Sequence, residues 1–385
     1  MAIEKGLMQA PLGIEEEVKK NGKLPEPDLE IESVNPDMVT LDDGSVEITL
    51  IPGAENDDTE FDANLAETLD EDILESTASE LLDVIESDMD SRKDWADTYV
   101  KGLDVLGFQY EERSDPWEGA CGVYSTVLAE AAIRFQAETM SETFPAFGPV
   151  KTKIMGDETK EKEEAAARVK TDMNFQLTEN MVEYRPEHER LLYSLGLSGS
   201  AFKKVYYDET LARPVSKFVA PEDLIVPYYT TDLETCSRIT HVVKMHENDV
   251  KKLQAIGFYR NVDIEYGDNA NVSSDIQSEK EKLEGMEPGY DDGEVSLLYE
   301  VHCNLDLEGF EDMGQDGEPS GVKLPYIVTI DSGNDEILAI RRNFKEEDPM
   351  KKKTEYFVHF KFLPGLGFYG FGLTHMIGGL SKAST

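Results

Sequence analysis

The spacing of apolar residues changes at Gly199, and this change constrains the fold more than any other feature of the sequence. Before Gly199, apolar residues recur at helical intervals, as Val127, Ala131 and Phe135 do at every fourth position. Residues spaced in this way lie on one face of a helix. We expect four helices in this part of the chain, over residues 77–106 with a break near residue 90, 123–144, 157–181 and 185–197.

After Gly199, the apolar residues fall into short runs rich in Val, Ile, Tyr and Phe, which is typical of strands. We expect strands over residues 201–207, 215–219, 238–245, 295–301, 324–330, 336–342 and 355–362. Between them, the sequence predicts a short helix over 247–256 and a long polar loop over 268–292. Helices followed by strands predict an α+β fold, in which amino-terminal helices precede a mostly antiparallel β-rich region.

Residues 1–75 form an acidic segment that we expect to be a mostly disordered tail. Residues 1–90 contain 27 Asp and Glu but only 4 Lys and Arg, and prolines interrupt the apolar clusters up to residue 75. Such a segment buries too little apolar surface to offset the entropy lost on ordering. One short strand over 46–51 is the expected exception. Helical structure should begin at Thr77, because its spacing from Glu80 is that of a capping box.

The net charge and the cysteines limit the classes of function. The chain has 80 Asp and Glu against 37 Lys and Arg, a formal net charge of −43, so binding to nucleic acid by neutralising phosphates is disfavoured. Cys121, Cys236 and Cys303 lie far apart and have no CxxC spacing, so we expect neither disulfides nor a zinc cluster, and a reducing compartment. The first residues show no secretory signal, which predicts synthesis in the cytoplasm.

Known catalytic and ligand-binding motifs are incomplete in this sequence. His246 and Glu247 begin an HExxH pattern, but Val250 stands where the second histidine is required. Residues 196–200 resemble a GxSxG nucleophile elbow without its last glycine, and a partial calcium-loop match near Asp312 lacks two ligands. No phosphate-binding Walker loop and no dinucleotide fingerprint occur. We therefore expect a protein that is not an enzyme and has no cofactor, metal or catalytic residues.

Lys351, Lys352 and Lys353 form a basic run and are a candidate weak contact for phosphate. Three acidic residues at 346–348 precede this run. Short mixed-charge runs of this kind more often form a solvated hairpin tip, so the sequence leaves both interpretations open.

Residues 362–381 contain no Asp, Glu, Lys or Arg, and these twenty residues could span a bilayer. Four glycines and a proline within 362–372 argue against a span, because each glycine costs about 1 kcal/mol of helix propensity. We expect no membrane association. Glycines allow another backbone to approach closely, so this segment is a candidate for packing within the chain or between copies. The candidate residues for subunit packing or stem entry are Phe362, Gly365, Gly367, Phe368, Tyr369, Gly370, Phe371 and Gly372.

Four stretches in fixed order resemble the portal proteins of tailed double-stranded DNA bacteriophages, especially those of the podovirus type. They are SDPWEGA at 114–120, GSAFKKV at 199–205, PEDLIVP at 221–227 with RITHVVK at 238–244, and FYGFG at 368–372 running on to KAST at 382–385. The resemblance covers the chain from about residue 80 to its end. The acidic segment at the start of the chain has no counterpart in this family.

The resemblance implies a structural subunit of a ring, usually dodecameric, through which double-stranded DNA is packaged and ejected. It implies capsid, scaffold, terminase and tail adaptor proteins as partners, and DNA that passes through without sequence-specific binding. The implied location is the capsid vertex of the virion, after assembly in the host cytoplasm. Residues 76–198 would be a helical region, 199–366 a wing-like region, and 367–385 the start of a stem-like helix. No second stem helix, clip or crown follows, so we expect part of a longer portal protein or a split gene.

Two other classes of function remain open. The acidic segment is also typical of an acidic adaptor or a DNA-mimic protein without enzymatic activity, which would engage a basic partner. An enzyme of an unrecognised type is the third class. A ring favours the first interpretation where the chain supplies two different complementary patches, and the uncharged segment 362–380 would be one of them.

Overall fold

The computed structural model describes residues 37–40, 46–49, 61–108, 117, 125–208, 211–264, 266, 275–286, 295–313 and 318–384. The chain divides into two compact units, Met1–Asp58 and Thr59–Thr385. In the first unit, β1 (Asp37–Thr40) and β2 (Val46–Thr49) pair as an antiparallel hairpin. β2 lies within the strand that the alternating residues predicted.

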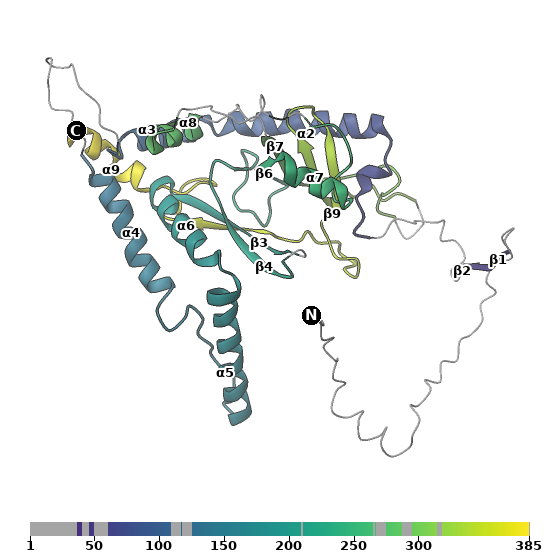
Figure 1. Ribbon diagram of the computed structural model, residues 1–385, viewed down its shortest axis with the longest axis horizontal. Coiled ribbons are helices and arrows are strands. Elements are labelled where there is room, and N and C mark those ends of the chain that lie inside the picture. Colours follow the sequence, from purple (N-terminus) through teal and green to yellow (C-terminus); the bar gives the residue numbers. More distant parts are fainter. Residues whose placement is uncertain are drawn as a thin grey trace, which may run out of the picture. The chain divides into compact units, whose positions relative to one another are not determined.

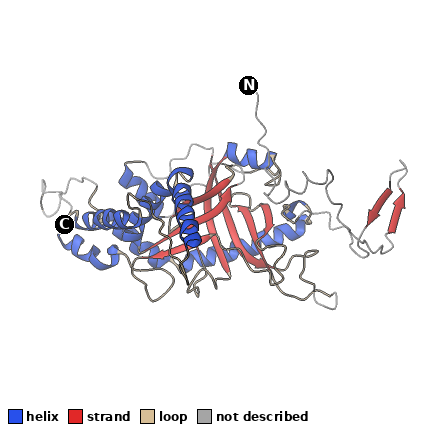
Figure 2. Cartoon of the chain, turned by 90° about the horizontal axis from the view of Figure 1, so that it is seen from below, coloured by secondary structure: helices blue, strands red, loops and turns tan. Residues whose placement is uncertain are grey.

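The second unit has the predicted α+β fold, with helices before antiparallel sheets along the chain. Figure 2 shows its helices in blue and its strands in red. The helices before Gly199 are α2 (Glu71–Ser91), α3 (Lys93–Asp104), α4 (Val127–Thr143), α5 (Lys160–Phe175) and α6 (Tyr184–Ser198). The first predicted helix is broken at Arg92, between α2 and α3, close to the expected position. The third ends in the π-helical turn η2 (Gln176–Asn180), so its regular α part is shorter than we expected.

The strands after Gly199 form two sheets in which all neighbours pair antiparallel. One has the order β10-β3-β4 and the other has the order β5-β6-β7-β8-β9. The strands are β3 (Ser200–Asp208), β4 (Arg213–Val219), β5 (Leu224–Ile225), β6 (Arg238–His246), β7 (Val295–Leu305), β8 (Leu324–Asp331), β9 (Ile337–Arg342) and β10 (Phe357–Lys361). All the predicted strands are present, and β5, which has only two residues, is additional.

Helices cover both faces of the five-stranded sheet. Leu74, Ala78 and Leu81 lie on one face of α2 and are buried against side chains of β7, β8 and β9. On the opposite face, α7 (Glu247–Ala255) contributes the fully buried Val250, which packs with Leu298 of β7. Successive strand residues point to opposite faces, so Leu297 and Tyr299 of β7 enter the core beneath α2 and Leu298 between them enters the core beneath α7.

Folded structure begins earlier than we expected. The 3-10 turn η1 (Leu65–Glu67) precedes α2, and its Leu65 is fully buried. The side chain of Asn64 fixes this turn to β9, because it donates to Leu338 O at 3.0 Å and accepts from Ile340 N at 3.0 Å. Thr77 therefore lies inside α2 and is not a cap. The acidic residues that suggested a tail here include the first turn of α2, where the helix dipole favours negative charge.

A second core lies among α3, α4, α8 (Asp275–Glu284) and α9 (Leu373–Ser384), whose positions Figure 1 shows. α8 falls within residues 268–292, where we expected a loop. Its sequence is strongly charged, and only Ile276 among its residues is buried, so its packing against α3 is not visible in the apolar pattern. Within the described residues, no helix has both the length and the apolar character needed to cross a membrane.

Candidate functional site

The glycine-rich segment 362–372 packs against the connection between α6 and β3. Gly199 ends α6 in the left-handed region, with φ of 86°. A Cβ at Gly199 would lie 2.4 Å from both the carbonyl oxygen of Gly370 and the amide nitrogen of Gly372. No side chain fits in this space, so glycines at these positions are what allow the two backbone segments to touch.

Hydrogen bonds fix this backbone contact on both sides. The amide of Phe362 donates to Gly199 O at 3.0 Å, and the amide of Gly370 donates to Ser200 Oγ at 2.8 Å. Ser200 Oγ also lies 3.1 Å from Nε2 of His359 on β10. The buried Ser200 hydroxyl therefore connects the glycine-rich segment to the three-stranded sheet.

Aromatic side chains surround the contact. Phe368 is buried and lies 4.6 Å, centroid to centroid, from the ring of His359. Tyr369 stacks on Trp95 of α3 with ring centroids 4.5 Å apart, and Phe362 meets Phe135 of α4 edge-on at 4.9 Å. The segment thus joins α3, α4 and the three-stranded sheet.

Arg92, in the break between α2 and α3, holds the turn that leads into β5. Its guanidinium donates to the carbonyl oxygens of Pro221 at 3.1 Å, Glu222 at 2.5 Å and Leu224 at 3.0 Å. The same group lies 3.4 Å from the hydroxyl of Tyr369. Three carbonyl groups and the glycine-rich segment therefore converge on one side chain.

Not all the predicted packing residues lie inside this junction. The structure buries Phe368, Gly370 and Gly372, leaves Phe362, Gly365 and Tyr369 partly buried, and exposes Gly367 and Phe371. The fully exposed Leu366 lies at the same outer edge. One side of the segment thus packs within the chain, and the other side is exposed.

Sequence reasoning missed Arg92 and Trp95. Both lie at the start of α3, and Arg92 lies within 6.0 Å of the Trp95 ring. An arginine and a tryptophan three positions apart, at a break between two helices, are the sequence signal from which this junction could have been predicted. The turn that Arg92 binds belongs to the PEDLIVP stretch, but sequence spacing alone does not pair the two.

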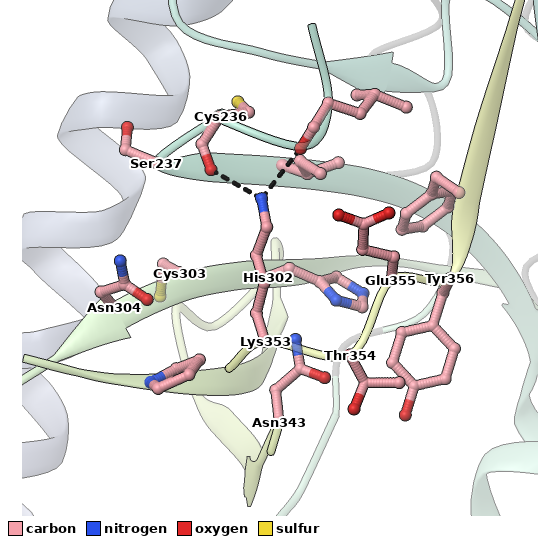
Figure 3. A pocket seen from close by; sticks show the side chains of 14 residues that line it. Cys236, Ser237, His302, Cys303, Asn304, Asn343, Lys353, Thr354, Glu355 and Tyr356 are labelled. Carbon is pink, nitrogen blue, oxygen red and sulfur yellow. Dashed lines mark hydrogen bonds between the residues drawn. The ribbon is translucent and has the colours of Figure 1, made fainter. Parts of the chain in front are cut away.

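The three lysines at 351–353 do not form a common anion site. Lys351 Nζ is paired with Asp312 Oδ1 at 2.6 Å, and the side chain of Lys352 is exposed. Lys353 Nζ donates instead to the carbonyl oxygens of Leu233 at 2.8 Å and Cys236 at 3.0 Å (Figure 3). Backbone and carboxylate acceptors occupy two of the three ammonium groups.

Lys353 lines the small pocket drawn in Figure 3, together with His302, Asn343, Glu355 and Tyr356. The volume of this pocket is about 20 Å³, which is room for about one water molecule. Drug-sized ligands occupy pockets of about 300–1,000 Å³. The lining combines these polar side chains with apolar ones such as Leu233 and Phe357, and the pocket has no space for an organic substrate.

Next to this pocket, an ion pair joins the two sheets. Lys204 Nζ of β3 lies 2.6 Å from both carboxylate oxygens of Glu300 on β7, and His302 Nε2 lies 2.7 Å from one of them. Burial would raise the pKa of Glu300, but the Lys204 charge and the His302 hydrogen bond outweigh it and hold this pKa well below its ordinary value. The carboxylate thus stays charged and connects β3 to β7.

The structure also places the residues of the incomplete motifs. Val250, at the missing histidine position, is fully buried in the core beneath α7. Among the described residues, no group of three or more His, Cys, Asp and Glu is arranged to hold a metal ion. Cys236 and Cys303 are buried free thiols, and Cys121 lies outside the described residues.

Three of the four stretches on which the family resemblance depends meet at the junction. They are residues 199–205, 221–227 and 368–372, which bond to one another through Ser200, Arg92 and Tyr369. In the remaining stretch, 114–120, only Trp117 is among the described residues. Compared with known proteins, the sequence matches no protein-family model and no curated protein.

Proposed function

We propose that this chain is a structural subunit of a phage portal ring, through which double-stranded DNA is packaged and ejected. The observation that supports this most is the junction around Arg92. Stretches far apart in the sequence, recognised for their resemblance to portal proteins, form one packed unit there.

The junction suits a subunit that works by its shape. The helices are connected to both sheets by hydrogen bonds of Arg92 and Ser200 to backbone groups and by the close backbone contact of Gly199, Gly370 and Gly372. Close-packed interiors have low compressibility and transmit strain, so neighbouring copies joined at their edges would hold a fixed ring geometry. In this proposal, the protein performs no bond-making chemistry.

Charge also agrees with a conduit for DNA. A protein that holds a duplex neutralises its phosphates with lysines and arginines, whereas residues 91–385 of this chain contain 53 acidic and 33 basic residues, a net charge of −20. An acidic wall repels phosphates and lets the duplex slide. The proposed partners are therefore other copies of this chain, with capsid, scaffold, terminase and tail adaptor proteins at the ring surfaces, and the proposed location is the virion.

Negative-stain electron microscopy combined with native mass spectrometry tests this function. The purified chain is examined at several protein concentrations and at low and high salt, because salt screens repulsion between acidic copies. We expect annular particles with a single dominant stoichiometry. Monomers under every condition contradict the proposal, and binding of those monomers to basic proteins would support the acidic adaptor instead, which the net charge also favours.

A further inference from the structure

Helix α5 buries no side chain within the described part of the chain. None of its residues is buried, although it has sixteen residues and isolated helices of about 12–15 residues are marginal in water. The preceding segment holds it at two points: Thr152 Oγ1 donates to Ala166 O at 3.2 Å, and Asn174 accepts from Val150 N at 3.0 Å and donates to Val150 O at 3.2 Å. Figure 1 shows α5 extending beyond α6, away from the sheets.

The exposed face of α5 carries an apolar stripe. Val169 and Met173 are 49% and 46% exposed and lie four residues apart, so they are adjacent on the helix surface. Ala165, one turn earlier, is partly buried on the same face. A helix stabilised by tertiary packing would place this stripe against another surface.

Helix α9 divides its larger apolar side chains between two faces, because Leu373 and Ile377 pack against the core of α3 and α4, whereas Met376 and Leu380 are exposed. Its buried positions are the small residues Thr374, Gly378 and Ser381, and a Cβ on Gly102 of α3 would lie 2.1 Å from Thr374 Cγ2. Small residues therefore allow α9 to lie close to α3, and Met376 and Leu380 remain for another contact.

The outward face of α9 is formed by Met376 and Leu380, which are 59% and 65% exposed and one turn apart. Gly379 lies beside Leu380, and the space above its Cα is empty within 4 Å. A second helix could approach the backbone closely there.

Charge favours a second copy of this chain as the occupant of this face. Two copies with a net charge of −43 each repel one another. The repulsion is weakest where the two contacting surfaces have a low net charge. Residues 362–381 have no charged side chain, and residues 151–182 have six basic and seven acidic ones. These are two different surfaces of the same chain, as a ring-closing heterologous contact requires.

We infer that the Val169 and Met173 stripe of one copy packs on the Met376 and Leu380 face of the next copy. This inference rests on the proposed ring function and adds which surfaces join. The charged residues beside the stripe would stay at the solvated rim, so no charge need be buried. A helix without a core of its own would then gain one on assembly.

Mixing two single-cysteine variants tests this contact. Val169→Cys and Met376→Cys are each made in a Cys121→Ser background, since Cys236 and Cys303 are buried. The two proteins are mixed under ring-forming conditions and treated with a short thiol cross-linker. Because each copy carries one accessible thiol, a link between positions 169 and 376 can form only between copies. Ile256→Cys, at a 72% exposed site directly after α7, replaces Val169→Cys in the control mixture.

We expect at least about tenfold more cross-linked dimer from the first mixture than from the control, because docking raises the local thiol concentration. Annular particles that give no more 169–376 product than the control overturn this contact and leave the ring intact. Absence of annular particles in the unmodified chain contradicts the proposed function instead, so the two failures are distinguishable. A matched pair of Val169→Asp and Ile256→Asp extends the test, because only the first should prevent ring formation.

Discussion

The carbonyl oxygen of Gly370 occupies the space that a side chain on Gly199 would need. The two glycines are 171 positions apart in the sequence, yet a Cβ on Gly199 would lie 2.4 Å from that oxygen. The positive φ of Gly199 adds a second reason for glycine at this site. Backbone contact at this point joins the end of α6 to the segment that leads into α9.

Alanine at Gly199 should therefore destabilise the protein by about 3 kcal/mol or more, since the clash involves backbone that cannot move aside cheaply. Urea unfolding followed by circular dichroism measures this change. Gly379→Ala is the matched control, because its Cβ meets nothing within 4 Å and alanine in a helix gains up to about 1 kcal/mol over glycine. Equal stabilities of the two variants would show that the close contact is not maintained in solution.

The sequence predicted the strands best, for a physical reason. Each strand is a short run of β-branched and aromatic residues bounded by polar turns, and this local pattern is sufficient to identify it. β5 has only two residues, Leu224 and Ile225, so no period can be read from it. Its position depends on Arg92, which binds the preceding turn from another part of the chain.

Long-range contacts also account for the other differences. α8 is held by Ile276 and by an ion pair between Lys280 and Glu222, and neither is visible in a local apolar pattern. The three neighbouring lysines at 351–353 look alike in the sequence. In the structure, Lys351 pairs with Asp312, whereas Lys353 donates to the carbonyl group of Cys236. Within the glycine-rich segment, the packing role of the glycines could be predicted, but their backbone partner could not.

Arg92→Lys should destabilise the protein by about 2–3 kcal/mol, although it preserves the charge. The planar guanidinium reaches three carbonyl oxygens at once, whereas an ammonium group cannot reproduce that geometry. Carbonyl groups left unpaired in a partly buried site cost about 1–3 kcal/mol.

Arg134→Lys provides the control for Arg92, because Arg134 forms an exposed ion pair with Glu138. Exposed pairs of this kind contribute at most about 1 kcal/mol. Urea unfolding of both variants gives the comparison. If Arg92→Lys is no less stable than Arg134→Lys, Arg92 does not hold the turn as described.

Stability should fall as the pH drops below 6.5, partly because of His359. Burial, together with the positive charge of Lys361, lowers the pKa of His359 from 6.5 to about 3. Between these values, the unfolded chain binds a proton that the folded chain does not, so the stability difference is present above pH 6.5 and declines toward pH 3. The decline from one such group is at most about 1.4 kcal/mol per pH unit.

His359→Gln removes this titration, so the variant should lose less stability than the unmodified protein between pH 6.5 and 4. Thermal unfolding across this range measures the difference. His246→Gln is the control, because His246 is exposed at the end of β6. A variant profile parallel to that of the unmodified protein would mean that His359 is protonated in the folded state.

The ion pair between β3 and β7 gives the last prediction. Lys204→Met should cost about 3–5 kcal/mol, because it leaves the partly buried Glu300 carboxylate without its ammonium partner. Adding Glu300→Gln should recover much of that loss, since the uncompensated charge is then gone. Lys251→Met breaks an exposed pair with Glu247 and should cost at most about 1 kcal/mol. Additive effects of the Lys204 and Glu300 substitutions in a double-mutant cycle would contradict a direct bond between the sheets.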